Sequence, residues 1–308
     1  MASTRELRRR IKSIKNTSQI TKAMQMVAAT KMKRAQNQAL SGRPYTQNLG
    51  QALLRLLPRI NIQSHLLLSP KSIKTSGVIL LSTDKGLVGA LNTNLTRTIF
   101  SSNLPADTVY YTLGKKGRAY VARTSKNLKA DFENPEKVTF RQAKQLSRLV
   151  IEAFNAGEVG QVLIVYPEFV STLRQQAKLV QLLPVDLASV IRNLGDEGSQ
   201  DYKDKSKDSS LAPRSEPVAQ NDNKEFLFEP DPDVLLDFIL LHHIETKIYQ
   251  ALLETKASEQ SARMIAMQNA TDNALELLDD LKLTFNQTRQ AGITKEILEI
   301  ATAAAVMT

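Results

Sequence analysis

The sequence contains no cysteine and no tryptophan, and both absences limit what the protein can be. Without cysteine it can form no disulfide scaffold and no thiolate zinc site, and it has no thiol for catalysis or for a redox switch. Aromatic residues make up only 5% of the 308 residues, which suits long helices better than a broad globular interior. The composition therefore favours a helix-rich protein that is not a secreted, disulfide-bonded one.

A long apolar run is also missing. The nearest candidate, residues 235–241, is short and interrupted by Asp237, whereas a membrane-spanning helix needs about 18 apolar residues or more. The basic N-terminus lacks the apolar stretch of a secretory signal. We therefore expect a soluble protein of the cytoplasm or of an organelle matrix.

Positive charge is concentrated at the N-terminal end. The formal net charge is +10, and the first 34 residues contain one acidic residue, Glu6, against ten basic ones: Arg5, Arg8, Arg9, Arg10, Lys12, Lys15, Lys22, Lys31, Lys33 and Arg34. Such an end can face nucleic acid, an anionic membrane surface, an acidic protein partner or only solvent, and charge alone does not choose among these.

Side chains near these charges favour a protein partner. No aromatic residue is available there to stack on nucleic-acid bases, whereas Met24, Met26, Val27 and Met32 offer an apolar surface suited to a protein sleeve. A basic coiled-coil adaptor that binds nucleic acid stays open as the alternative hypothesis. It would be identified by DNA binding that falls steeply with salt.

Residues 4–57 have the pattern of one long helix. A heptad-like stripe of apolar and small residues runs along it, formed by Leu7, Ile11, Ile14, Met24, Ala28, Met32, Ala35 and Ala39. Ser18 and Thr21 fill the gap in the stripe, where their small side chains would let a partner helix approach closely. Gly42 and Pro44 predict a kink or a local weakening, and Pro58 ends the segment.

The last segment predicts a second and longer helix that starts at Pro232 and Asp233. Residues 234–287 contain no glycine or proline, which corresponds to a helix of about 80 Å. Near-heptad spacing places a stripe at Ile244, Ile248, Leu252, Thr255, Glu259, Ala262, Ala266, Asn269, Asn273, Leu277 and Leu281. A helix of this length needs a partner, so we expect an antiparallel coiled coil between the two chain ends.

The middle of the chain has the alternating pattern of an α/β domain with a largely parallel sheet. Short β-type runs are expected at residues 77–82, 108–113 and 161–166, and helices at 91–101, 117–122 and 140–156. The polar stretch 195–225 is typical of a flexible linker or surface insert. The predicted division is a coiled-coil helix at 1–58, an α/β domain at 59–194, a polar linker at 195–230 and a coiled-coil helix at 231–308.

No motif in the sequence predicts an active site. The turn at residues 84–90 follows a strand and contains two glycines, but it lacks the spacing of a phosphate loop or of a dinucleotide-binding fingerprint, and residues 114–117 also fit a turn. Adjacent His242 and His243 point in different directions on a helix and cannot chelate a metal together. We therefore predict no catalytic residue, cofactor or metal ion; an enzyme that uses the α/β domain is the third and least favoured hypothesis.

Long motifs at both ends and in the middle resemble one known family. They are ITKAMQMVAA at 20–29, STDKGLVGALN at 82–92, the segment 169–184, ASEQSARMIAM at 257–267 with ATDNA at 270–274, and ITKEILEI at 293–300. In these motifs the chain resembles the gamma subunits of F-type ATP synthases over nearly its whole length. The family's cysteines that make the plastid type redox-sensitive are absent, which favours a bacterial origin.

The resemblance implies an architecture and a set of partners. It implies an antiparallel coiled coil of the two termini with a Rossmann-like α/β domain at its foot, and no nucleotide bound by the chain itself. The coiled coil would stand inside a ring of alternating alpha and beta subunits. The foot would bind the epsilon subunit and the membrane rotor ring of c subunits, at the cytoplasmic face of a bacterial inner membrane or of a thylakoid-type membrane.

The resemblance also implies a role and contact residues. The chain would be the central rotor stalk, transmitting torque between the ion-driven rotor ring and the catalytic ring during ATP synthesis or hydrolysis, without an active site of its own. By matching motifs, the residues expected to contact the alpha/beta ring are Met24, Arg263, Arg289, Gln290, Thr294 and Glu296.

Overall fold

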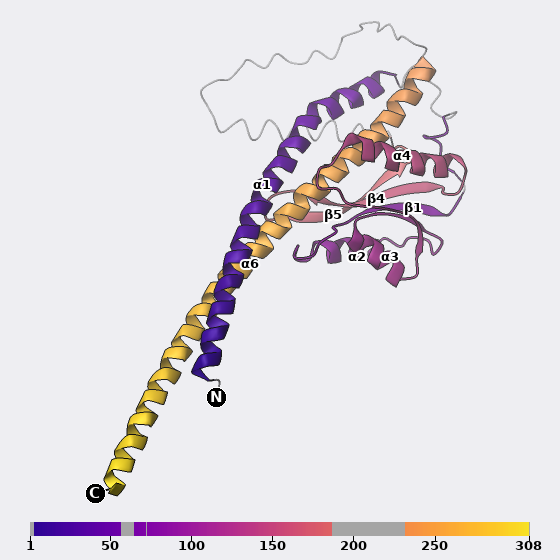
Figure 1. Ribbon diagram of the computed structural model, residues 1–308. Helices are drawn as coiled ribbons and strands as arrows, with labels where there is room; N and C mark the ends of the chain where they lie inside the picture. Colours follow the sequence, from indigo (N-terminus) through magenta and orange to yellow (C-terminus); the bar gives the residue numbers. More distant parts are fainter. Residues whose placement is uncertain (1–2, 57–64, 72, 187–231, 308) are drawn as a thin grey trace, which may run out of the picture.

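The computed structural model describes residues 3–56, 65–71, 73–186 and 232–307, so the predicted polar linker 195–230 lies outside the described residues. Two long helices lie side by side, and an α/β domain packs against them (Figure 1). The helices are α1 (Thr4–Leu56) and α6 (Pro232–Met307). Their 53 and 76 residues give lengths of about 80 Å and about 115 Å.

Both long helices begin where the sequence predicts. The Ser3 hydroxyl accepts a hydrogen bond from the backbone N–H of Glu6 and so caps α1. Pro44 lies inside α1, which does not end there but curves over in its C-terminal part (Figure 1). This confirms the predicted disturbance, because proline removes a backbone donor inside a helix. α6 continues through Gly292 without a break.

The two helices run antiparallel over most of the length of α1, as expected. Tyr45 near the end of α1 contacts His242 near the start of α6, whereas Arg8 lies over the ring of Phe285. In between, Ser18 and Thr21 are buried. The Thr21 hydroxyl lies 2.7 Å from that of Thr271, which confirms the predicted close approach of the helices at this position.

The predicted stripe on α6 holds as far as Ala262 and is wrong at three positions beyond it, whereas Ala266 and Leu281 of the stripe are half-buried. Asn269, Asn273 and Leu277 are exposed, and the side chains buried in their place are Met267, Thr271 and Leu278. The reason is that α6 is covered on two sides upstream of Arg263. There Glu259 bonds to the α/β domain and Ala262 packs with Val88 of that domain, so these positions are buried by the domain. The predicted stripe therefore lies on the side of α6 that faces the domain. Beyond Ala262 this side differs from the seam, which is the side of α6 that packs against α1.

The α/β domain contains a five-stranded sheet in the order β3-β2-β1-β4-β5. Its strands are β1 (Ser76–Leu81), β2 (Val109–Leu113), β3 (Asn127–Phe132), β4 (Gln161–Phe169) and β5 (Gln175–Leu183). All pairs are parallel except β4 with β5, which confirms the largely parallel sheet. The predicted helices are present as α2 (Leu91–Ser101), α3 (Lys115–Arg123) and α4 (Phe140–Asn155).

Each face of the sheet is covered by a different set of helices. In β1, Val78 and Leu80 pack with residues of α2 and α3, while Ile79 and Leu81 face the opposite way and join a core with α4, α6 and the end of α1. The shaft is therefore part of one layer of the domain, and the two share one hydrophobic core.

Two strands were not predicted, β3 and β5. In β3 half-buried positions alternate with exposed ones, including Lys129 and Asp131, because the strand lies at the sheet edge. β5, at the opposite edge, contains three glutamines and one lysine for the same reason. Neither strand has the continuous apolar run that identifies a strand buried on both faces.

Candidate partner-contact surfaces of the shaft

The carboxyl edge of the parallel strands faces the shaft. Doubly wound α/β proteins bind ligands in the crevice outside this edge. Here the β1–α2 loop packs Val88 and Leu91 with Ala262, and the β3–α4 loop reaches α6 through Asn134. The chain's own helix thus occupies the position at which related folds hold a ligand.

The β4–β5 hairpin makes a further contact with α6. The Ser258 hydroxyl donates to the carbonyl of Pro167 at 2.8 Å, and the Ser261 hydroxyl donates to the carbonyl of Thr172 at 2.6 Å. Both serines are fully buried. Their small side chains let the backbone of the hairpin lie directly on the helix.

The glycine-containing loops do not form a phosphate site. At the N-terminus of α3, where an anion would bind backbone N–H groups, Lys115 donates to the Asp84 carboxylate, Lys116 to the carbonyl of Thr83 and Gly117 to the Ser82 hydroxyl. The available donors are thus used within the chain. Residues 84–90 form the strand-to-helix turn that the sequence predicts, with Leu87 and Gly89 at φ of 61° and 56°.

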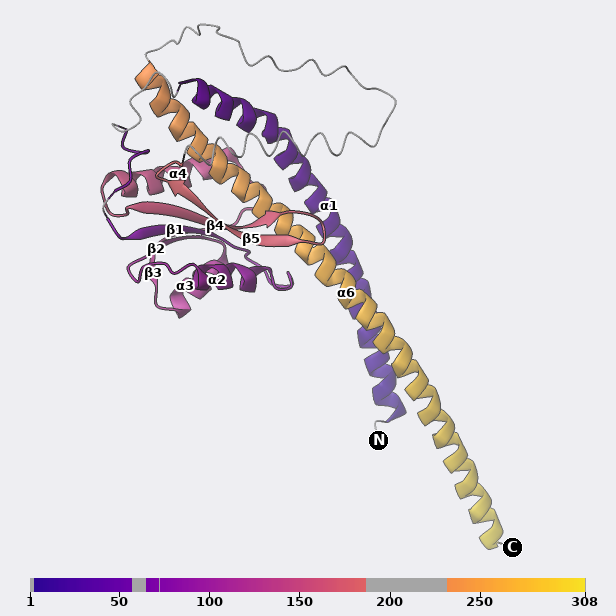
Figure 2. The same cartoon turned by 180° about the vertical axis from the view of Figure 1, so that it is seen from behind.

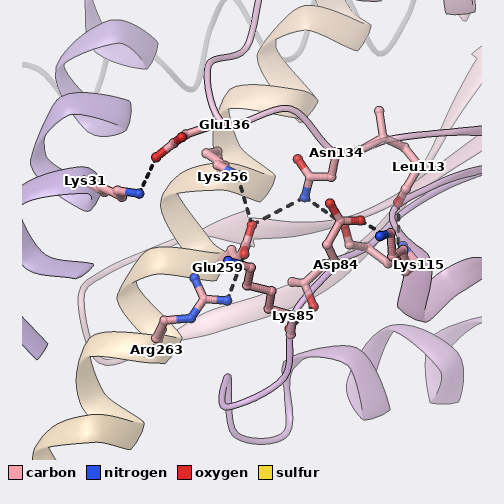
Figure 3. Close-up of polar contacts among 12 residues, drawn as sticks. Lys31, Asp84, Lys85, Leu113, Lys115, Asn134, Glu136, Lys256, Glu259 and Arg263 are labelled. Carbon is pink, nitrogen blue, oxygen red and sulfur yellow. Dashed lines mark hydrogen bonds and ion pairs between the residues drawn. The ribbon is translucent and has the colours of Figure 1, made fainter. Parts of the chain in front are cut away.

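A buried carboxylate lies at the centre of the contact between the domain and the shaft (Figure 3). The Glu259 side chain is 5% exposed and pairs with Arg263 at 2.9 Å and with Lys256 at 3.4 Å. The Asn134 amide donates at 3.4 Å to Oε2 of Glu259, the oxygen that Lys256 also contacts. A buried carboxylate is tolerated when it is paired and hydrogen-bonded in this way, because these bonds offset the loss of hydration.

Of the six expected contact residues, Arg263 belongs to this cluster. Its side chain is only 12% exposed, so Glu259 is its main contact in the free chain. Met24 is 39% exposed on α1. Since Thr21 lies opposite Thr271, Met24 is level with about position 268, more than one turn from Arg263.

The other four expected contact residues lie together near the C-terminal end of α6: Arg289, Gln290, Thr294 and Glu296, all exposed. Since Thr21 lies opposite Thr271, the first residue of α1, Thr4, is level with about position 288, so about 20 residues of α6 continue alone for about 30 Å (Figure 2). This single helix also exposes large apolar side chains, at Ile293, Ile297, Leu298 and Ile300. An isolated helix with such side chains needs a surface to cover it.

The basic end of α1 is largely open to solvent. Arg10 pairs with Glu6, Arg8 lies over the ring of Phe285, and Lys31 bonds to Glu136 of the domain. The other basic residues of the first 34 are exposed: Arg5, Arg9, Lys12, Lys15, Lys22, Lys33 and Arg34. They present a positive surface beside the apolar side chains of Ile20, Met24, Met26 and Val27.

The sequence prediction did not identify the cluster around Glu259. The spacing of Lys256, Glu259 and Arg263 on one helix face is visible in the sequence and could have indicated it. Asn134 could not be found in this way, because it comes from a loop 125 positions earlier in the chain.

The described residues form neither a membrane-spanning helix nor a metal-binding cluster. In the described part of the chain, no helix is long and apolar enough to cross a membrane. No group of three or more His, Cys, Asp or Glu side chains among these residues is arranged to hold a metal ion.

Comparisons with known proteins agree with this architecture. Residues 3–307 match the family model described as ATP synthase. The ATP synthase gamma chain of Opitutus terrae is 43% identical over 304 residues, 98% of each chain, and that of Heliobacterium modesticaldum is 39% identical over all of both chains. A chain in the structure of the central stalk and c-ring of the Tetrahymena thermophila mitochondrial ATP synthase has 25% identity and a TM-score of 0.56, covering 82% of this chain and 99% of that one.

A second solved structure extends the likeness in fold to nearly the whole chain. A chain of the Euglena gracilis mitochondrial ATP synthase gives a TM-score of 0.63 over 99% of this chain and 94% of that one, at 21% identity.

The chain has a two-helix shaft with a projecting end, and the shaft covers the carboxyl edge of the sheet, where related folds bind ligands. These features define a stalk protein with a mechanical role. The chain belongs to the ATP synthase family, and within it to the gamma chains. Its function is that of the central rotor stalk, a subunit that is not itself a catalyst.

Proposed function

We propose that this chain transmits torque between a catalytic ring of alpha and beta subunits, which surrounds the shaft, and an ion-driven c-ring at the foot. The α/β domain, within residues 59–194, would bind the epsilon subunit and the c-ring. The helices 1–58 and 231–308 would form the shaft. The complex would lie at the cytoplasmic face of a bacterial inner membrane or of a thylakoid-type membrane.

One observation carries the proposal: α6 projects about 30 Å beyond its partner helix with apolar side chains exposed, at Ile293, Ile297, Leu298 and Ile300. A closed sleeve of protein would cover such a helix on all sides. Among the polar residues on the same stretch, we propose that Arg289, Gln290, Thr294 and Glu296 engage the sleeve at particular rotation angles. Met24 and Arg263 would do so nearer the domain.

The alternative of a nucleic-acid adaptor is not favoured by the geometry. The basic surface of α1 lies beside exposed Ile20, Met26 and Val27, which offer no stacking platform for bases. A surface that combines positive charge with aliphatic side chains suits an acidic protein partner better.

The test is co-expression of this chain with its cognate alpha and beta subunits. A stoichiometric complex on size-exclusion chromatography, with ATPase activity that depends on this chain and rotation of a bead fixed to its α/β domain, supports the proposal. Failure to associate, with retention of the chain on DNA at low salt, would overturn it in favour of the adaptor.

A further inference from the structure

The β3–α4 loop, residues 133–139, reaches both helices of the shaft (Figure 3). On one side Asn134 bonds to Glu259 of α6. Two residues later Glu136 bonds to Lys31 of α1. The hairpin contacts of Ser258 and Ser261, in contrast, hold α6.

The loop is fixed at both of its ends. At its start, the carbonyl of Phe132 accepts a hydrogen bond from the backbone N–H of Gly114. At its end, Val138 is buried in the main core and Thr139 forms a capping box with Gln142 at the start of α4. Pro135 restricts the backbone between the two shaft contacts. A loop held in this way moves with the domain.

Asn134 also joins α6 to the centre of the sheet edge. Its amide donates to the carbonyl of Ser82 at 3.2 Å as well as to Glu259. The Ser82 hydroxyl in turn bonds to the carbonyls of Leu113 and Gly114 and accepts from the N–H of Gly117. A sideways force on the sheet edge is thereby passed to α6 through one amide.

The two contacts differ in strength. Glu259 is buried and held on its own helix by Arg263 and Lys256, so the bond from Asn134 is made to a fixed, poorly hydrated acceptor. The Lys31 and Glu136 side chains are 42% and 79% exposed, so water and salt weaken this ion pair. The hydrogen bond from Lys31 nevertheless holds the pKa of the Glu136 carboxyl below its ordinary value.

We infer that the β3–α4 loop is a coupling clamp that passes torque between the α/β domain and both shaft helices, through Asn134 to α6 and through Glu136 to α1. The hydrophobic core already joins the domain to α6 and to the end of α1, at Leu53 and Leu56. The loop adds a contact with each helix at a second level along the shaft, and contacts at two levels oppose pivoting of the domain. This inference rests on the proposed function, since it assumes that the domain and the shaft rotate together.

The test compares variants in the assembled complex, in vesicles that contain the c-ring. Asn134→Leu removes the amide at similar volume, and Lys31→Glu and Glu136→Lys each place like charges together. The pair Lys129 and Glu158 is the matched control, because it is an ion pair of the same domain with side chains 43% and 50% exposed. Lys129→Glu and Glu158→Lys reverse its charges away from the shaft.

The readouts are ATP hydrolysis, ions pumped per ATP against an opposing gradient, and the torsional stiffness of the shaft in single complexes. We expect Asn134→Leu to lower stiffness and ions pumped per ATP while hydrolysis continues. Lys31→Glu and Glu136→Lys should each give a smaller loss, and the double exchange of both residues should restore coupling. The two control exchanges should leave all three readouts unchanged.

The outcomes separate the clamp from the proposed function. If the natural chain couples hydrolysis to pumping and Asn134→Leu does so equally well with unchanged stiffness, the clamp is wrong and the stalk function stands. If Asn134→Leu does not assemble, the charge exchange decides, and single exchanges without effect overturn the clamp. If the natural chain itself fails to couple, the proposed function falls first.

Discussion

The hydroxyl groups of Thr21 on α1 and Thr271 on α6 lie 2.7 Å apart inside the seam of the coiled coil. Each hydroxyl is also within hydrogen-bond distance of a carbonyl of its own helix, from Ser18 and Met267. Two hydroxyl hydrogens are shared among three contacts, so one threonine donates across the seam while the other donates to its own helix. This polar pair fixes the level at which the two helices meet.

The first prediction is a coupling between these two threonines. Thr21→Val or Thr271→Val alone should lower the free energy of unfolding by about 0.5–1.5 kcal/mol, because the hydrogen bond across the seam is lost and the remaining hydroxyl keeps only the carbonyl of its own helix. The double variant should cost less than the two single costs together, since two apolar groups of the same shape then meet. Urea unfolding of the full chain measures all three.

The matched control is Thr284→Val. Thr284 is exposed on α6 and its hydroxyl bonds only to its own helix, at the carbonyl of Asp280. We expect its effect to stay within about 0.5 kcal/mol. Strict additivity of the two seam substitutions would show that the hydroxyl pair contributes nothing.

The buried side chain of His243, near the start of α6, leads us to expect that acid lowers the free energy of unfolding. Burial, with the charges of Lys247 and His242 as smaller causes, lowers its pKa to about 3, from an ordinary value of 6.5. Neither ring nitrogen has a hydrogen-bond partner among the described residues. Between these two pKa values the unfolded chain binds a proton that the folded chain does not. Stability from this group is therefore present above pH 6.5 and is lost as the pH falls, at up to about 1.4 kcal/mol per pH unit.

The variant His243→Leu tests this by removing the titrating group. We expect the free energy of unfolding of the natural chain to fall more steeply than that of the variant between pH 6.5 and pH 4.5, a range of about two units. Equal slopes for the two proteins would show that His243 is not neutral and buried at neutral pH.

How far the sequence predicts this fold depends on what covers each residue. An apolar run predicts β1, and uninterrupted helical periodicity predicts the two long helices. Each pattern is regular because the residues of each element have similar neighbours along its length. The seam on α6 beyond Ala262 could not be predicted from spacing. Before this point α6 is covered by both the domain and α1, and beyond it by α1 alone. The buried side therefore changes, and exposed Asn269 and buried Met267 are only two positions apart on the helix.

Some of the candidate contact surfaces could be predicted from the sequence and others could not. Residues Arg289 to Glu296 lie on one stretch of one helix, so a sequence motif indicates them together. The cluster of Asn134, Ser82 and Glu259 joins three distant segments across the edge of the sheet, and no local pattern predicts such a meeting. It depends on β3, a polar edge strand that the apolar pattern does not identify.

Two neighbouring leucines on α6 test which side of this helix packs against α1. Leu278 is 8% exposed and Leu277 is 49% exposed. Leu278→Ala should lower the free energy of unfolding by about 2–3 kcal/mol, because it leaves a cavity between the helices, and Leu277→Ala should change it by about 0.5 kcal/mol or less. Thermal unfolding of the isolated full chain makes the comparison, and a larger effect at Leu277 would restore the stripe expected from the sequence.

The last prediction concerns rotation of the shaft past the surrounding ring. Met24 is 39% exposed on α1, a helix whose exposed surface also carries many basic residues. In Met24→Lys, an added positive charge facing acidic groups of the ring would gain about 1 kcal/mol at one angle. Rotation away from that angle would slow about fivefold.

We therefore expect Met24→Lys to assemble normally but to pump fewer ions per ATP. Met26→Lys is the control, because Met26 is also exposed, at 60%, and lies two positions along the helix on a different face. If both variants lose coupling equally, the effect is one of total charge and not of the Met24 contact. If Met24→Lys pumps as well as the natural chain, Met24 does not contact the ring at all.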